Sequence, residues 1–286
     1  MTVKLPFIFG DLSTTTPMAP MAPRGPHTGD LLASLPVADL LRPGGGAWKL
    51  KAPPAWKLSK VTKVGGEDVL SVFHQKNSGT SSDPGVGGIG ISAAPRGFPS
   101  STGAVVAWDV FFEPGWDFVR GGKFGGMGVG PGVASGYRHS EDGASNRVMW
   151  QEDGGCIVYI YPPEGSKQEV PALRAQSDKD HGAGFFGREF AKALKIGAWN
   201  RIELGTKLNT FTGSRPNADG KASLTVNGVS RTLDDVVWRK FPKLAIESFE
   251  FGVFFGGPSP ASRNCRALYK NFAVHAWKEA DKKPGA

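Results

Sequence analysis

Residues 145–161 read SNRVMWQEDGGCIVYIY, two β-like runs joined by a short acidic, glycine-containing turn. Both runs are rich in β-branched and aromatic residues, which together with the turn predicts a β-hairpin. Side chains alternate between the faces of a strand, so Ser145 and Arg147 share one face of the first strand. Tyr159 and Tyr161 share one face of the second in the same way.

The length of the turn decides whether these two pairs of side chains meet. If the connection has an odd number of residues, such as three with glycine in the left-handed conformation, all four lie on one face. A two-residue connection separates them unless a bulge intervenes. The alternate residues Cys156, Val158 and Ile160 are apolar and face the core, so we expect the polar face to be open and concave.

Similar β-rich runs flank the hairpin and are separated by turn residues. Asn227-Gly228 between two of them predicts a type I′ turn. The one good helical pattern is 186–195. We therefore expect an all-β protein, a β-jelly-roll sandwich of two antiparallel sheets. The predicted strand regions are 104–112, 145–151, 156–161, 199–206, 223–233, 247–255 and 267–277.

Composition outside these runs suggests the domain limits. Residues 1–29 form a Pro/Thr-rich arm that we expect to be flexible, and 278–286 a polar tail. A single domain is expected over 30–277. It begins with a short helix or turn pair in 31–41 and contains a long Gly/Ser/Pro-rich loop at 77–103, of the kind that is functional or mobile.

The overall composition excludes several classes of protein. The 40 Gly and 22 Pro in 286 residues disfavour long helices, while 40% hydrophobic residues supply a core. No apolar run is long enough to span a membrane, and the six-residue run near the N-terminus is too short for a secretory signal. The formal charge of +8 favours an anionic partner.

Two cysteines, Cys156 and Cys265, are too few for a disulfide framework and lack the paired histidines of a zinc site. One bridge and two buried thiols both remain open, and we favour thiols. We expect no metal and no cofactor.

Three other sites fit poorly. The string G-x-G-x-x-G at 85–90 is not followed by a helix, and the glycines around Lys123 lack a P-loop's Ser or Thr. A glycosidase needs two converging carboxylates, but Glu247 and Glu250, three apart, point to opposite faces of a strand. Carboxylates converging from different strands would support a hydrolase, which is a minor alternative.

The hairpin face combines the permanent cation of Arg147, two phenols and a hydroxyl, and the ammonium of Lys123 can reach it from the preceding glycine-rich strand. Such a set suits an anionic sugar. The alternative is that these groups simply decorate a solvated sheet face.

The order GGK (121–123), S-x-R (145–147), Y-x-Y (159–161) and FGVFFGG (251–257) resembles polysaccharide lyase family 14, and within it the alginate/glucuronate lyases of chlorella viruses. The resemblance spans roughly residues 50–277. It implies a β-jelly roll that degrades 1,4-linked polyuronates by β-elimination, leaving unsaturated uronate ends.

Carried over position by position, the resemblance implies a set of active-site residues. It places the family's lysine on Lys123, its serine and arginine on Ser145 and Arg147, and a substrate-side histidine on His139. The tyrosine pair of the family falls on Tyr159 and Tyr161.

The chemistry of a uronate lyase requires three kinds of group. Arg147 is suited to gripping the carboxylate and stabilising the enolate-like intermediate, with Ser145 as an added donor. Tyr159 or Tyr161 is a candidate base if nearby cations lower its pKa, and Lys123 is the rival base. The sequence leaves this choice open.

We therefore expect an enzyme, a polysaccharide lyase acting on an anionic polysaccharide. A non-catalytic jelly roll that binds acidic glycans is the alternative; nucleic-acid binding rests on charge alone and is not expected. The chain is expected to be a monomer with no membrane partner. From the viral resemblance, we expect it in the virion or released at host lysis, where it degrades the algal cell wall.

Overall fold

Fourteen of the strands in the part of the chain that the computed structural model describes belong to two antiparallel sheets. The described residues are 32–79, 85–132, 134–176, 181–256 and 259–278. The larger sheet contains β1 (Leu32–Leu35), β2 (Lys60–Val64), β3 (Glu67–His74), β5 (Gly103–Phe112), β10 (Trp199–Lys207), β13 (Gly220–Val226), β14 (Val229–Val236) and β16 (Cys265–Trp277). The smaller contains β4 (Ile89–Ala93), β6 (Gly121–Val129), β7 (Ala144–Gln151), β8 (Cys156–Tyr161), β9 (Ala183–Phe185) and β15 (Ile246–Phe255).

The remaining elements are short. Strands β11 (Phe211–Thr212) and β12 (Arg215–Pro216) pair with each other. The helical turns are η2 (Val37–Leu41), η3 (Pro43–Trp48), η4 (Glu152–Gly154) and α1 (Pro171–Arg174).

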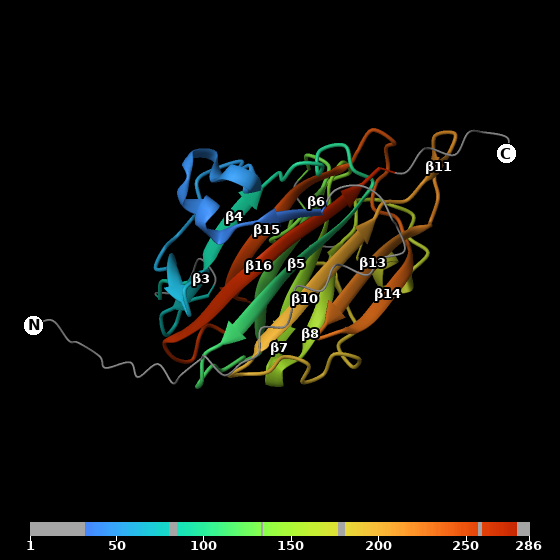
Figure 1. Cartoon of the computed structure of the whole chain (residues 1–286). Helices are drawn as coiled ribbons and strands as arrows, with labels where there is room; N and C mark the ends of the chain where they lie inside the picture. Colours follow the sequence, from blue (N-terminus) through green and yellow to red (C-terminus); the bar gives the residue numbers. More distant parts are fainter. Residues whose placement is uncertain (1–31, 80–84, 133, 177–180, 257–258, 279–286) are drawn as a thin grey trace, which may run out of the picture.

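The two sheets lie face to face. The larger has the order β14-β13-β10-β5-β16-β3-β2, with β1 on β16, and the smaller has the order β4-β15-β6-β7-β8-β9. In Figure 1 the larger sheet faces the viewer, and β15 and β6 lie behind it. The all-β sandwich of antiparallel sheets predicted from the sequence is confirmed.

Aromatic side chains fill the space between the sheets. Alternation turns one face of each strand inward, where Trp108 of β5 packs edge-on against Phe251 of β15 with ring centroids 5.7 Å apart. The ring centroids of Trp150 of β7 and Phe124 of β6 are 5.0 Å apart. Burying such a side chain stabilises the fold by roughly 1.5–3 kcal/mol. With its inner face committed to the core, the smaller sheet carries its polar groups on the opposite face.

The predicted strands and the predicted turn are found in the structure. Each predicted run lies on an observed strand, and Asn227 and Gly228 have φ of 51° and 86°, as a type I′ turn requires. The run at 223–233 covers two strands, β13 and β14, on either side of that turn.

Two local predictions are wrong. Residues 186–195 form turns and no helix, because positive φ values at Phe186 (71°) and Lys192 (56°) break the helix and Phe190 is drawn into the core. The region 77–103 contains β4, which pairs with β15 and buries Ile89 and Ile91.

The N-terminal region also differs from expectation. Where 31–41 predicted a short helix or turn pair, the structure has β1 followed after Pro36 by η2. The predicted arm 1–29 lies outside the described residues, as does the tail apart from Lys278, so the domain limits stay predictions.

Candidate active site

The connection between β7 and β8 has the odd length that brings the four hairpin side chains together. The Gln151 amide donates to the Gly155 carbonyl (2.8 Å), leaving three residues, Glu152 to Gly154, in the loop. Asp153 and Gly154 have φ of 56° and 76°. Ser145 therefore pairs with Tyr161, and Arg147 pairs with Tyr159.

A continuous row of paired residues crosses the whole smaller sheet at Arg147. Partners in an antiparallel pair lie on the same face, so the side chains of this row all project away from the core. The glycine of β6 leaves a gap in the row beside the guanidinium. In strand order the row is Ser92, Glu250, Gly126, Arg147, Tyr159 and Gly184.

Lys123 joins this face one row away, where it pairs with Met149 of β7 and Phe254 of β15. Its Nζ lies 5.7 Å from the ring centroids of both Tyr159 and Phe254. Burial, and then the positive charge of Arg147, lowers the pKa of Lys123 to about 8. A neutral amine is thus accessible close to neutral pH.

Arg147 is held by a short hydrogen-bond chain. Its Nε donates to Ser145 Oγ (3.2 Å), which donates to the Ala134 carbonyl (2.6 Å). Among the described residues its two terminal nitrogens have no hydrogen-bond partner, so they can receive a carboxylate. Burial lowers the pKa of Arg147, and the charge of Glu250 opposes that shift.

The two tyrosines form one unit. Their ring centroids are 5.4 Å apart at 75°, and the Gly182 amide donates to the Tyr159 hydroxyl (3.1 Å). Burial first, then Tyr161, raises the pKa of Tyr159 to about 12. The sequence made a tyrosine the candidate base only if its pKa were lowered, and burial raises the pKa of Tyr159 instead.

His139 packs against the tyrosine pair. Its ring centroid lies 5.2 Å from that of Tyr161, and its Nδ1 donates to the Pro162 carbonyl (3.1 Å). A carbonyl only accepts, so the proton sits on Nδ1. Its Nε2 is buried without a protein partner among the described residues.

The five predicted groups share one face, but they lie deeper than the open face that the sequence predicted. Ser145 and Tyr161 are each only 3% exposed, while Lys123, Arg147 and Tyr159 are half-buried. The segments that carry Ala134, His139 and Gly182 contact them. We call the outer face of the smaller sheet beside these segments the groove. These covering segments are loops, and the alternation of residues along strands does not predict where loops lie.

Sequence reasoning gave Glu250 no role, although it named the residue. Its carboxylate accepts from Ser92 Oγ (2.8 Å) and lies in the row of Arg147. Alternation along β15 is the signal that places it on this face.

As the sequence favoured, Cys156 and Cys265 are free thiols. Within the described residues no cluster of His, Cys, Asp and Glu is arranged to hold a metal ion.

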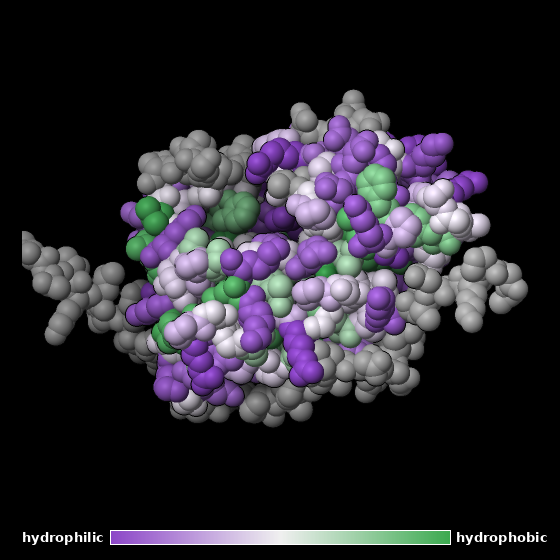
Figure 2. Space-filling model, turned by 90° about the horizontal axis from the view of Figure 1, so that it is seen from above, coloured by the Kyte–Doolittle hydropathy of each residue, from purple (hydrophilic) through white to green (hydrophobic). Residues whose placement is uncertain are grey.

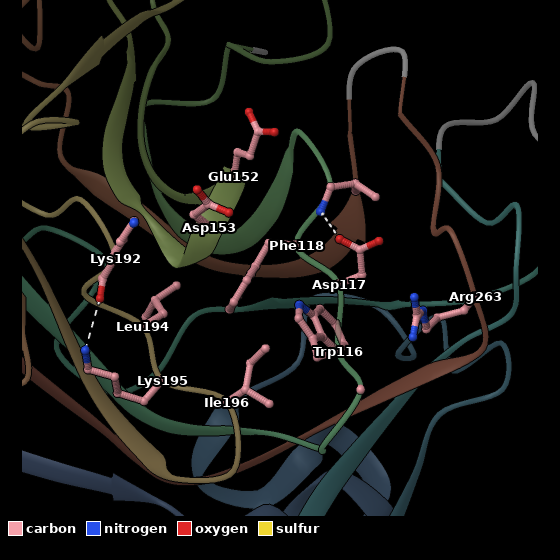
Figure 3. Close-up of a pocket in the computed structure, with 12 residues that line it drawn as sticks. Trp116, Asp117, Phe118, Glu152, Asp153, Lys192, Leu194, Lys195, Ile196 and Arg263 are labelled. Carbon is pink, nitrogen blue, oxygen red and sulfur yellow. Dashed lines mark hydrogen bonds between the residues drawn. The ribbon is translucent and has the colours of Figure 1, made fainter.

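A pocket of about 700 Å³ lies at the other end of the hairpin, at its turn (Figure 3). It contains none of the predicted site residues, and its three carboxylates are balanced by three cations. It is therefore a poor candidate for binding a polyanion. Its lining residues are Gly115, Trp116, Asp117, Phe118, Val119, Glu152, Asp153, Lys192, Leu194, Lys195, Ile196 and Arg263.

Seen from above, the molecule is hollowed near its centre and mostly hydrophilic residues border the hollow, while apolar residues form small separate patches (Figure 2).

No described helix is both long enough and apolar enough to cross a bilayer.

Comparison with known proteins gives concordant matches. Residues 62–272 match the family model Polysaccharide lyase 14. Exolysin of Paramecium bursaria Chlorella virus 1 is 30% identical over an alignment of 200 residues, and the match covers 62% of this chain but only 30% of the Exolysin length. Alginate lyase vAL-1 from Chlorella virus is 45% identical, with a TM-score of 0.81 covering 86% of this chain and 99% of that one. The marine PL-14 alginate lyase from Aplysia kurodai, 22% identical with a TM-score of 0.64 over 76% of this chain and 87% of its own, shares the fold.

Proposed function

Because the chain belongs to polysaccharide lyase family 14, we propose that it cleaves 1,4-linked polyuronates of the glucuronan or alginate type by β-elimination. The observation that carries this proposal is the shared face of Lys123, Arg147 and the tyrosine pair. A free guanidinium fork, an amine with a lowered pKa and a protonated phenol meet there.

The first step is neutralisation of the substrate carboxylate. The C5 proton of a uronate is weakly acidic until the charge on the neighbouring carboxylate is compensated. The Arg147 fork fits a carboxylate bidentately and stabilises the enolate-like intermediate. Ser145 orients this fork through its contact with Nε, since its own proton is used on the Ala134 carbonyl.

The second step moves two protons. The neutral amine of Lys123 removes the C5 proton, the C4–O4 bond breaks, and a C4=C5 double bond forms. The departing O4 takes a proton from the phenol of Tyr159 or Tyr161. A pKa of about 12 keeps Tyr159 protonated, which supports the role of acid for this residue and of base for Lys123.

The chlorella virus relatives also support a biological setting. We propose that the chain degrades the wall of an algal host, carried in the virus particle or released at lysis. We further propose that it acts as a monomer.

The direct test is to incubate the protein with glucuronan, poly-mannuronate and poly-guluronate and to follow ultraviolet absorbance from unsaturated ends. At least one polymer should give a steady rise, and Lys123→Ala should abolish it while leaving the fold intact. Tyr159→Phe and Tyr161→Phe should each reduce the rise, and the larger loss identifies the phenol that protonates O4. Val229→Ala, which removes an exposed side chain on the larger sheet, serves as control. Binding without new unsaturated ends would instead identify a glycan-binding module.

A further inference from the structure

Tyr137 is the most exposed aromatic side chain among the described residues, with 65% of its surface accessible. Its φ is 65°, in the left-handed region that bulky residues rarely adopt. Such a conformation is unfavourable and persists only where the surrounding structure enforces it, often at ligand sites. Neither exposure nor strain is expected of a tyrosine that serves packing alone.

The chain on both sides of Tyr137 is fixed to the candidate active site. Three residues earlier, the Ala134 carbonyl accepts the Ser145 hydroxyl. Two residues later, the ring of His139 packs on Tyr161. The phenol of Tyr137 is close enough to contribute to the raised pKa of Tyr159. Tyr137 therefore stands at the rim of the groove, beside the tyrosine pair.

His181 meets Tyr137 from a segment far away in the sequence. The two ring centroids lie 4.9 Å apart at 86°, an edge-to-face contact. The next residue, Gly182, donates its amide to the Tyr159 hydroxyl. The neighbours of Tyr137 contact Ser145 and Tyr161, and the neighbour of His181 contacts Tyr159. Both members of this rim pair, Tyr137 and His181, are thus held beside the tyrosine pair.

We propose that the rim pair is a sugar-binding subsite, which stacks against the uronate ring next to the one that is cleaved. This proposal rests on the proposed lyase function and adds to it a pair of residues that makes KM depend on the length of the substrate.

The chemistry of the rim pair fits one ring of a polyuronate. The C–H bonds on a pyranose face carry partial positive charge and pack against the electron-rich face of an aromatic ring. Since the pair borders the Tyr159 and Tyr161 side of the groove and not the Phe254 side, it can reach only substrates that extend past the tyrosines.

The test measures kcat and KM on a ladder of uronate oligosaccharides of increasing length. Tyr137→Ala should raise KM about 3- to 10-fold for substrates long enough to reach the rim, the size expected for one stacking contact. The value of kcat should stay within about twofold, because the ring does not touch the reacting atoms. The shortest cleaved oligosaccharide should be unaffected, and Tyr137→Phe should behave like the wild type.

Two further variants separate binding from loop structure. His181→Ala should raise KM by a smaller factor, and His181→Phe should restore it by keeping the edge contact. Val229→Ala is the matched loss of an exposed side chain elsewhere. An unchanged KM at every length in Tyr137→Ala, or an equal rise at all lengths, would overturn the subsite. If Tyr137→Ala does not fold in a thermal melt, the two His181 variants decide in the same way.

Failure of the lyase function would be distinguishable from failure of the subsite. Calorimetric titration of Lys123→Ala with the longest oligosaccharide measures binding without turnover. Adding Tyr137→Ala to that variant should weaken the affinity by the same factor of about 3 to 10. An unchanged affinity would contradict the subsite whether or not the wild type is a lyase.

Discussion

Lys123 and Tyr159 are neighbours on the groove face, and burial shifts their pKa values in opposite directions. Burial disfavours the charged form of any group, which is the protonated amine of Lys123 and the deprotonated phenol of Tyr159. The pKa of Lys123 falls to about 8 and that of Tyr159 rises to about 12. One environment thus prepares a proton acceptor and a proton donor on neighbouring residues, with Lys123 Nζ 5.7 Å from the Tyr159 ring centroid.

The pH profile of the reaction follows from this pair. Because only the neutral amine accepts a proton, kcat/KM should rise about tenfold per pH unit below pH 8 and level off above it. Steady-state rates between pH 5 and 10 measure this limb. Lys123→Ala should remove activity at every pH, and Tyr159→Phe should leave the midpoint unchanged in its residual activity. A rate that is still rising tenfold per pH unit at pH 10 would instead favour a tyrosine base.

The planar fork of Arg147 matters as much as its charge. Arg147→Lys keeps a cation but loses bidentate geometry and the contact with Ser145. We expect kcat to fall about 100-fold, the scale for losing a group that stabilises developing charge. Rates on the preferred polymer measure this, with a thermal melt to show that the fold is intact. Unchanged turnover would argue against a carboxylate clamp.

At the scale of single strands, β6 shapes the groove by lacking side chains. Gly126 lies between Glu250 and Arg147 in the central row, and a Cβ there would collide with the Asn146 carbonyl of β7. That collision is with backbone, so the strand pair itself must shift to relieve it. The glycine therefore keeps β6 and β7 close and leaves space beside the guanidinium.

Gly126→Ala should consequently impair both stability and activity. We expect a loss of about 1–3 kcal/mol in the free energy of unfolding, as for other overpacked positions, and a marked loss of kcat as Arg147 moves. Urea unfolding and rate measurements test this. Gly90→Ala is the matched control on the same face, since its Cβ would lie an ordinary 3.6 Å from Ala55 Cβ. Equal behaviour of the two variants would contradict the close-approach explanation.

Strand periodicity explains what could be predicted of the site. The pairing of Ser145 with Tyr161 and of Arg147 with Tyr159 follows from alternation plus one fact, the odd length of the turn. The burial of Tyr161 and the contacts of His139 arise from loop segments whose path depends on tertiary packing. The strand β4 escaped prediction because Gly90 within it and the glycines just before it obscure the alternation of Ile89 and Ile91.

Across the sandwich, the alternation of side chains along each strand separates core and groove. The strands that carry Lys123, Arg147 and Tyr159 outward carry Phe124, Val148 and Val158 inward. Anything that loosens the contact between the two sheets therefore also disturbs the groove. One group in that contact is titratable, since His74 at the end of β3 is buried between the rings of Trp116 and Phe255.

His74 should make the fold sensitive to acid. Burial, and then the charge of Lys57, lowers its pKa from 6.5 to about 3. At pH values between 3 and 6.5 the imidazole is protonated in the unfolded chain but neutral in the native state. The free energy of unfolding is therefore unaffected above pH 6.5 and falls by about 1.4 kcal/mol per pH unit below it.

Urea unfolding from pH 7 to 4 measures this slope. His74→Leu or His74→Gln should flatten it, whereas His181→Gln, which removes an exposed imidazole, should not. Native carboxylates add their own pH dependence at low pH, so the comparison rests on the difference in slope between variants. Equal slopes in His74→Leu and the wild type would show that His74 is protonated in the folded state, contrary to this prediction.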